Sequence, residues 1–150
     1  MSRLPVLSKM RLGELAGLCG AVLLIVSLTQ PWYETAAGNR DFWDTFGPAA
    51  ALLLAALAAA LTMLVAALTE REGPALAVAS AVWCVLLGLA GVIAAIVRLL
   101  ERPENASSLC IGPWLALAGT LLIFTGAWQV LRDERPSRYR AANPQPRPRP

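Results

Sequence analysis

Four long stretches of the chain contain no charged residue, and the charged residues fill the short segments between them. The uncharged stretches are 19, 25, 25 and 27 residues long, at 15–33, 45–69, 73–97 and 105–131. The hydrocarbon core of a bilayer is about 30 Å thick, so a spanning helix needs roughly 20 apolar residues. This pattern predicts four membrane-spanning helices.

Gly-Pro pairs mark where the last three helices begin, because proline is tolerated in the first turn of a helix. The expected helices are 13–30, 47–69, 74–99 and 112–131, joined by outer loops 31–46 and 100–111. The short link between the second and third helices makes them antiparallel neighbours. We therefore expect an all-α fold, an antiparallel four-helix transmembrane bundle over 1–131, followed by a disordered basic tail over 132–150.

Composition agrees with this prediction and removes several classes of function. The chain is 57% hydrophobic and only 15% charged, and it contains no histidine, so imidazole ligands and an imidazole general base are excluded. The three cysteines stand far apart, which disfavours metal binding and dithiol chemistry. We expect no metal and no other cofactor.

The basic residues are distributed unevenly between the two sides of the bundle. Ten of the 13 lie on the side that carries both termini. By the positive-inside rule both termini are cytoplasmic, in the plasma membrane of a bacterium. A secretory signal over the first stretch is the alternative, but the segment 35–37 is a poor cleavage site. Because the charge surrounds apolar spans, the net charge of +3 does not indicate nucleic acid binding.

Small residues recur at helical spacing in each predicted span, which favours close helix packing in lipid. The first helix has Gly13, Gly17 and Gly20; the second has Ala51, Ala55, Ala58, Thr62 and Ala66; the third has Ala77, Ala81, Cys84, Gly88, Gly91 and Ala95; the fourth has Gly112, Ala116, Gly119 and Gly126. We expect each set to face the bundle interior. Cys19 is expected to pack in the same way, and Cys110 to lie near the outer surface.

The first outer loop is the densest group of distinctive side chains. Aromatic and acidic residues alternate there: Trp32, Tyr33, Glu34, Asp41, Trp43 and Asp44. One interpretation is a cup that stacks on a cationic ligand. The other is an interfacial aromatic belt, completed by Trp114 and Trp128, and this is the interpretation we favour.

Two charged residues at helix ends are further candidates. Glu14 could couple proton or cation movement, but a carboxylate in the first turn of a helix is also stabilised by the helix dipole, and Arg11 is near. Arg98 could bind a substrate, reach outward to water or pair with Glu101. The basic tail is expected to contact anionic lipid headgroups.

The layout resembles small four-helix membrane proteins of actinobacterial type. The resemblance rests on Pro31, Trp32 and Tyr33 after the first helix and on the Trp43 to Phe46 step, and it implies a membrane location with no activity attached. Claudin-like proteins also carry tryptophans in the first outer loop, but with a cysteine pair that this loop lacks.

The functional expectation is a non-enzymatic accessory or scaffolding membrane protein that packs against itself or another membrane protein. It follows from the continuous small-residue faces and from the exclusion of charge from the spans. A transporter or channel for a small apolar or cationic solute is the first alternative, with the outer loop as entrance and Glu14 at the exit. A membrane enzyme acting on a lipid is the second.

Overall fold

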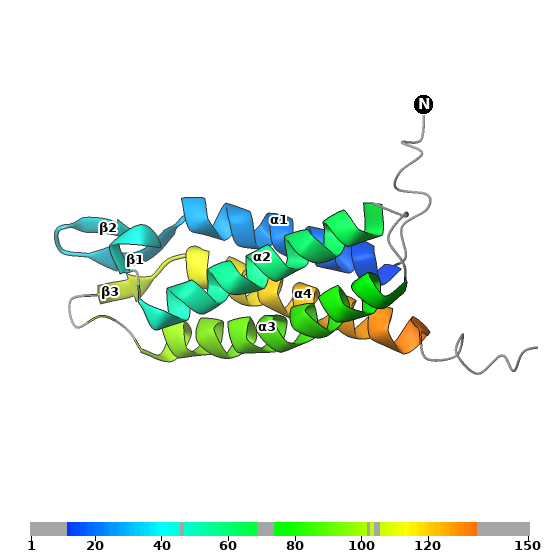
Figure 1. Cartoon of the computed structure of the whole chain (residues 1–150). Coiled ribbons are helices and arrows are strands. Elements are labelled where there is room, and N and C mark those ends of the chain that lie inside the picture. The colour runs from blue at the N-terminus through cyan, green and yellow to red at the C-terminus, as the bar shows by residue number, and fades with distance from the viewer. Residues whose placement is uncertain (1–11, 46, 69–73, 102, 104–105, 135–150) are drawn as a thin grey trace, which may run out of the picture.

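Four long helices and a small β-sheet make up the protein (Figure 1). The computed structural model describes residues 12–45, 47–68, 74–101, 103 and 106–134. The helices are α1 (Leu12–Thr29), α2 (Pro48–Leu68), α3 (Pro74–Leu100) and α4 (Gly112–Glu134). All four are long and apolar enough to span a membrane, as the charge pattern predicted. They begin and end within three residues of the expected bounds.

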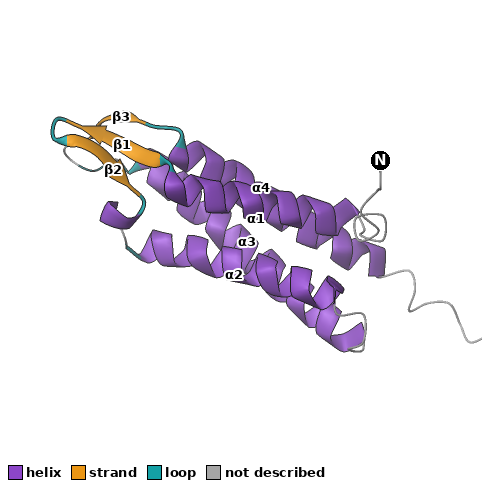
Figure 2. Ribbon diagram, turned by 90° about the horizontal axis from the view of Figure 1, so that it is seen from above, coloured by secondary structure: helices purple, strands orange, loops and turns teal. Residues whose placement is uncertain are grey.

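Each helix runs antiparallel to the next in the chain (Figure 1). The most extensive contact joins α1 to α4, followed by α3 with α4 and α2 with α3. The contact between α1 and α2 is much smaller, although they are consecutive in sequence. The bundle therefore closes through its first and last helices, and α2 is attached mainly through α3 (Figure 2).

The sheet lies at one end of the bundle, where the expected outer loops are. Its strands are β1 (Pro31–Thr35), β2 (Gly38–Asp41) and β3 (Ala106–Leu109), antiparallel and in the order β2-β1-β3. Tyr33 on the central strand pairs with Arg40 on one side and Leu109 on the other. A short 3-10 helix, η1 (Trp43–Thr45), leads from β2 toward α2. The prediction of four helices is confirmed, but an all-α fold was wrong.

The hairpin between β1 and β2 turns at Ala36 and Ala37. Thr35 pairs with Gly38, whose φ of 120° lies in the region that favours glycine, and the Thr35 hydroxyl donates to the Gly38 carbonyl at 2.6 Å. The turn occupies the segment that could have been a signal cleavage site. The predicted tail and the basic N-terminus lie largely outside the described residues, although Arg132 and Asp133 belong to α4.

Candidate functional site

Glycines from α1 and α4 meet in two reciprocal pairs along the interface between these helices. A Cβ added to Gly13 would lie 2.6 Å from the carbonyl oxygen of Gly126, and one added to Gly126 would lie 2.5 Å from that of Gly13. Gly20 and Gly119 face each other in the same way, at 2.6 and 2.8 Å. We call Gly13, Gly20, Gly119 and Gly126 the α1–α4 glycine seam. Main chain contacts main chain there, so no larger residue fits without moving a helix.

The other predicted packing glycines also face neighbouring elements. The nearest atoms to an added Cβ are Met63 Cε on α2 for Gly17 and the Phe124 main chain on α4 for Gly88. Gly91 lies between α2 and α4, with Ala56 and Thr120 each 3.0 Å from its added Cβ. Gly112 lies under the indole ring of Trp32 and so fits α4 to the sheet instead of to another helix. In α3, Ala81, Cys84, Gly88, Gly91 and Ala95 are all buried, as expected.

The small-residue face of α2 is turned away from the bundle, so the expectation that it packs inside was wrong. Ala51, Ala58 and Thr62 are exposed, and Ala55 and Ala66 are half-buried. The buried side of α2 instead carries Ala50, Leu53, Ala56, Ala59, Ala60 and Met63. We call Ala51, Ala55, Ala58, Thr62 and Ala66 the outward face of α2. Cys19 on α1, also expected to pack, is exposed too.

Two of the six candidate outer-loop residues form the core of the sheet region. Trp32 and Tyr33 are each 0% exposed, and the Trp32 indole N–H donates to the Ser27 carbonyl at 2.8 Å. Phe42 is also buried and meets Trp32 edge-on, with ring centroids 5.1 Å apart. These rings fix the sheet onto the ends of the helices, so Trp32 and Tyr33 belong neither to an exposed cup nor to an interfacial belt.

The other four candidates are exposed and are held by local contacts. A carboxylate oxygen of Glu34 accepts a hydrogen bond from the Ser108 hydroxyl at 2.7 Å, which ties β1 to β3. Asp44 accepts from the main-chain N–H of Asp41 at 3.3 Å. Trp43 packs edge-on against Phe42, with ring centroids 5.1 Å apart. The three carboxylates therefore lie on β1, at the end of β2 and on η1.

Arg98, at the last turn of α3, is the point where three elements meet. The Tyr33 hydroxyl donates to the Arg98 carbonyl at 2.7 Å, and the Arg98 guanidinium donates to the carbonyl of Thr45 at the end of η1. Burial raises the pKa of the Tyr33 phenol above its ordinary value, and the positive charge of Arg98 opposes that shift. Arg98 thus links α3 to the sheet and to η1.

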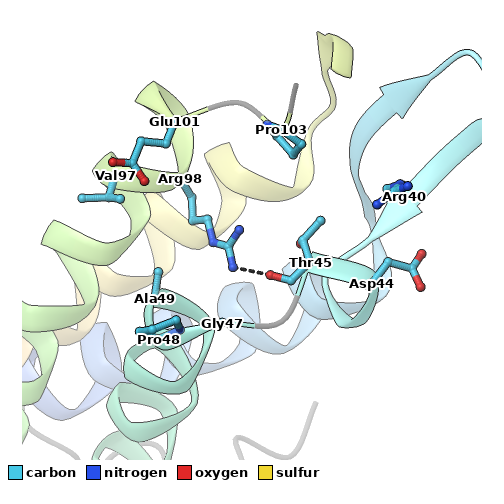
Figure 3. Close-up of a pocket in the computed structure, with 10 residues that line it drawn as sticks. All are labelled: Arg40, Asp44, Thr45, Gly47, Pro48, Ala49, Val97, Arg98, Glu101 and Pro103. Carbon is cyan, nitrogen blue, oxygen red and sulfur yellow. Dashed lines mark hydrogen bonds between the residues drawn. The ribbon is translucent and has the colours of Figure 1, made fainter. Parts of the chain in front are cut away.

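A cleft of about 610 Å³ opens around Arg98 (Figure 3). We call it the sheet-end cleft; its lining is Arg40, Asp44, Thr45, Gly47, Pro48, Ala49, Val97, Arg98, Glu101 and Pro103. The Arg98 guanidinium lies in the middle, while the carboxylates of Asp44 and Glu101 point away from it (Figure 3). The expected pairing of Arg98 with Glu101 is replaced by the hydrogen bond to Thr45.

Glu14 lies far from this cleft. It occupies the first turn of α1, half-buried, at the end of the bundle opposite the sheet (Figure 1). That position agrees with a carboxylate stabilised by the helix dipole.

Four exposed tryptophans lie at two levels of the bundle. Trp43 and Trp114 are at the sheet end, and Trp83 and Trp128 are toward the opposite end. Trp114 and Trp128 are separated by about 21 Å along α4, given 1.5 Å of rise per residue. This separation is shorter than the hydrocarbon core of about 30 Å, so the two levels of tryptophan do not by themselves mark the two interfaces of a bilayer.

Comparison of the chain with protein-family models, with curated proteins and with solved structures finds no match. The outward face of α2 and the sheet-end cleft are therefore interpreted from their own residues. Sequence reasoning identified the residues of the first but placed them on the wrong side of the helix. Arg98 and Asp44 were each identified from the sequence, but not as neighbours. They line the same cleft because η1 contacts α3, and nothing in the local sequence pattern indicates that contact.

Proposed function

We propose that this protein is a non-enzymatic scaffolding component of a bacterial plasma membrane. In this proposal its four helices span the bilayer, both termini are cytoplasmic and the sheet faces outward. The length and apolar composition of all four helices support the membrane placement. The excess of basic residues near the termini and the 69–73 link supports the orientation.

The outward face of α2 carries the proposal that the protein assembles with a partner helix. Lipid tails provide little hydrophobic driving force, so helices in a membrane associate where small side chains allow close approach. This chain already uses that principle in the α1–α4 glycine seam. On α2 the same kind of side chain is exposed at Ala51, Ala58 and Thr62, and the Thr62 hydroxyl donates to the Ala59 carbonyl at 2.8 Å. We infer that these small side chains allow close approach of a helix from a second copy or from another membrane protein.

The interior of the bundle favours a scaffold over a conduit. Its buried polar side chains among the described helices are Ser27 and Thr120, and their hydroxyls donate to carbonyls of their own helices, Leu24 and Ala116, at 2.8 and 2.9 Å. Two hydroxyls on different helices provide far fewer oxygen ligands than a dehydrated metal cation requires. The lining of the sheet-end cleft goes no deeper than the first turn of α2 and the last turn of α3.

Site-specific photo-crosslinking in the native membrane tests the proposal. The photoreactive amino acid replaces Ala58 in one variant and Ala118 in the matched control, since Ala118 is an exposed alanine on α4. We expect a discrete adduct from position 58 only, with a second copy or with another membrane protein. No adduct from position 58, or equal adducts from both positions, would contradict assembly through α2.

Topology has a separate test. A reporter fused after Pro150 is expected to be active only in the form that reports cytoplasmic location. Activity of a periplasm-specific reporter at that site would reverse the proposed orientation. The crosslinking result does not depend on this outcome, because the outward face of α2 lies within the span in either orientation.

A further inference from the structure

The charges around the sheet-end cleft are arranged around a positive centre. Arg40, Arg98 and Arg132 are the basic residues in the part of the chain that the structure describes, and the first two both line this cleft. Two acidic residues also line it. However, the Asp44 carboxylate accepts from the Asp41 main chain, and both carboxylates point away from Arg98 (Figure 3). An anion in the middle of the cleft would therefore meet the Arg98 guanidinium first, and Arg40 adds a second positive charge to the lining (Figure 3).

Arg98 is held in place before any ligand arrives. Its main-chain carbonyl accepts from the fully buried Tyr33, and one amino group of its guanidinium donates to Thr45. That contact uses one amino group of a side chain that carries five N–H donors. The guanidinium is also planar and matches the oxygens of a phosphate in a two-pronged arrangement. A side chain fixed in this way loses little freedom when it binds such a group.

The floor of the cleft continues into the apolar surface of the bundle. Ala49 and Val97 are apolar residues of its lining, and they belong to the first turn of α2 and the last turn of α3. About one turn further along each helix, Leu52 and Ile93 are exposed. Arg98 lies two residues from the end of α3, the level at which a spanning helix leaves the hydrocarbon core and meets phosphate groups. A molecule with a phosphate head and an acyl tail would fit both the cleft around Arg98 and the apolar helix surface next to it.

We propose that the sheet-end cleft binds the phosphate group of a membrane phospholipid, held by the guanidinium groups of Arg98 and Arg40. The acyl chains lie against the exposed apolar side chains of α2 and α3 below it. The proposal depends on membrane insertion but not on assembly through α2, so crosslinking at position 58 and lipid binding can fail independently. A phosphate exists in both leaflets, so the orientation of the chain does not affect the proposal.

Native mass spectrometry of the purified full-length protein, titrated with defined lipids, tests it. We expect retention of one dioleoylphosphatidylglycerol, and about tenfold weaker retention in Arg40→Gln, because a charge-assisted hydrogen bond is lost. Arg40 is exposed, so the substitution should leave folding intact. Arg98→Lys keeps the charge but loses the planar fork, and is expected to weaken retention at least as much. Arg132→Gln, which removes a positive charge from the opposite end, is the matched control and should bind as the parent does.

Two further probes separate the phosphate from the acyl chains and the lipid from a soluble compound. Dioleoylglycerol has the same chains without the phosphate and should not be retained. Glycerol 3-phosphate has the phosphate without the chains and should not displace the lipid. Equal retention by Arg40→Gln and the parent, or retention of dioleoylglycerol, would overturn the phosphate site. Displacement by glycerol 3-phosphate would overturn the assignment to a lipid.

Discussion

Along the α1–α4 glycine seam the main chains of two helices are in direct contact. On the outward face of α2, by contrast, small side chains point away from the bundle. At the seam a Cβ on Gly119 would lie 2.8 Å from the Gly20 carbonyl oxygen. On α2, Ala58 is exposed, and its neighbours two positions away, Ala56 and Ala60, are buried. Small residues at helical spacing are therefore in contact with another helix of the chain on α1 and α4, whereas on the outward face of α2 they are not.

The two regions also differ in how they are fixed. The seam is fixed by shape alone, because glycines have no side chain that could adjust. The η1 segment that precedes α2 is instead held by a hydrogen bond from Arg98 to Thr45, and Arg98 in turn accepts a hydrogen bond from Tyr33. Along its length α2 packs mainly on α3. We therefore expect substitutions in the seam to destabilise the whole bundle, and substitutions near α2 to have smaller and more local effects.

The largest effect is expected from Gly119→Leu. A side chain there would meet the main chain of Gly20 and Leu24, so α1 and α4 must separate. Unfolding should become easier by more than about 3 kcal/mol, or folding should fail, because overpacking against main chain has no flexible group to yield. Thermal unfolding in detergent checks this. Gly88→Leu, which meets the Phe124 main chain at 3.2 Å, should cost less. If Gly119→Leu has the same melting temperature as the parent, the glycine seam is not the tightest contact of the bundle.

The next effect concerns the hydrogen bond between the sheet and the end of α3. Tyr33→Phe removes the 2.7 Å hydrogen bond to the Arg98 carbonyl and should cost about 1 kcal/mol at neutral pH. Because the folded-state pKa of Tyr33 is raised above 10.0, its contribution is fully present below pH 10 and is lost as the pH rises through the folded value.

Denaturant unfolding at several pH values checks this prediction. The parent should lose stability above pH 10 more steeply than Tyr33→Phe does, since the unfolded phenol ionises first. Parallel pH profiles would show that Tyr33 contributes no pH-dependent stability. Arg132→Gln serves as the control, because it lies at the opposite end of the bundle and should follow the profile of the parent.

The sequence predicted the helices well because the exclusion of charge from a membrane span is a strong and local signal. It did not predict the sheet, because its strands are only four or five residues long and β3 comes from the other loop. Trp32, Tyr33 and Thr35 are good strand formers, but a strand gains stability only from partners that the local pattern does not reveal. Burial of Trp32 and Tyr33 follows from that pairing, so it was missed as well.

The inner side of α2 was misplaced for a different reason. This helix is apolar on all sides, from Ala50 and Leu53 on the buried face to Leu61 and Val65 on the exposed one. In water a polar side would have identified the exposed face, but lipid-facing residues are as apolar as the core. In α1 and α4 the glycines themselves mark the contact, since glycine is costly in a helix without a packing reason.

A much smaller effect on stability distinguishes Gly17 from the glycine seam. A Cβ on Gly17 would meet only the end of the Met63 side chain, at 2.7 Å, and that side chain is flexible. Alanine also favours helix over glycine by up to about 1 kcal/mol. We expect Gly17→Ala to change the free energy of unfolding by less than about 0.5 kcal/mol, while Gly119→Ala costs about 1–3 kcal/mol. If thermal unfolding showed the same loss of stability for both variants, a flexible neighbouring side chain would resist an added methyl group as strongly as rigid main chain does, and this prediction would be wrong.

The sharpest test of the comparison comes from two alanines on opposite sides of α2, only one of which should affect stability. Ala56 is 0% exposed and faces Gly91, so Ala56→Leu should destabilise the bundle by about 1–3 kcal/mol. Ala58→Leu places the same side chain on the outward face and should change the free energy of unfolding by less than about 0.5 kcal/mol.

Assembly should respond in the reverse way to these substitutions. Ala58→Leu is expected to abolish the crosslinked adduct, here formed from a photoreactive residue at Ala51 on the same face, while thermal unfolding stays at the parent value. Ala118→Leu on α4 should affect neither measurement. If Ala58→Leu leaves the adduct intact, the small residues of this face are lipid-facing only, and the proposed assembly through α2 is wrong.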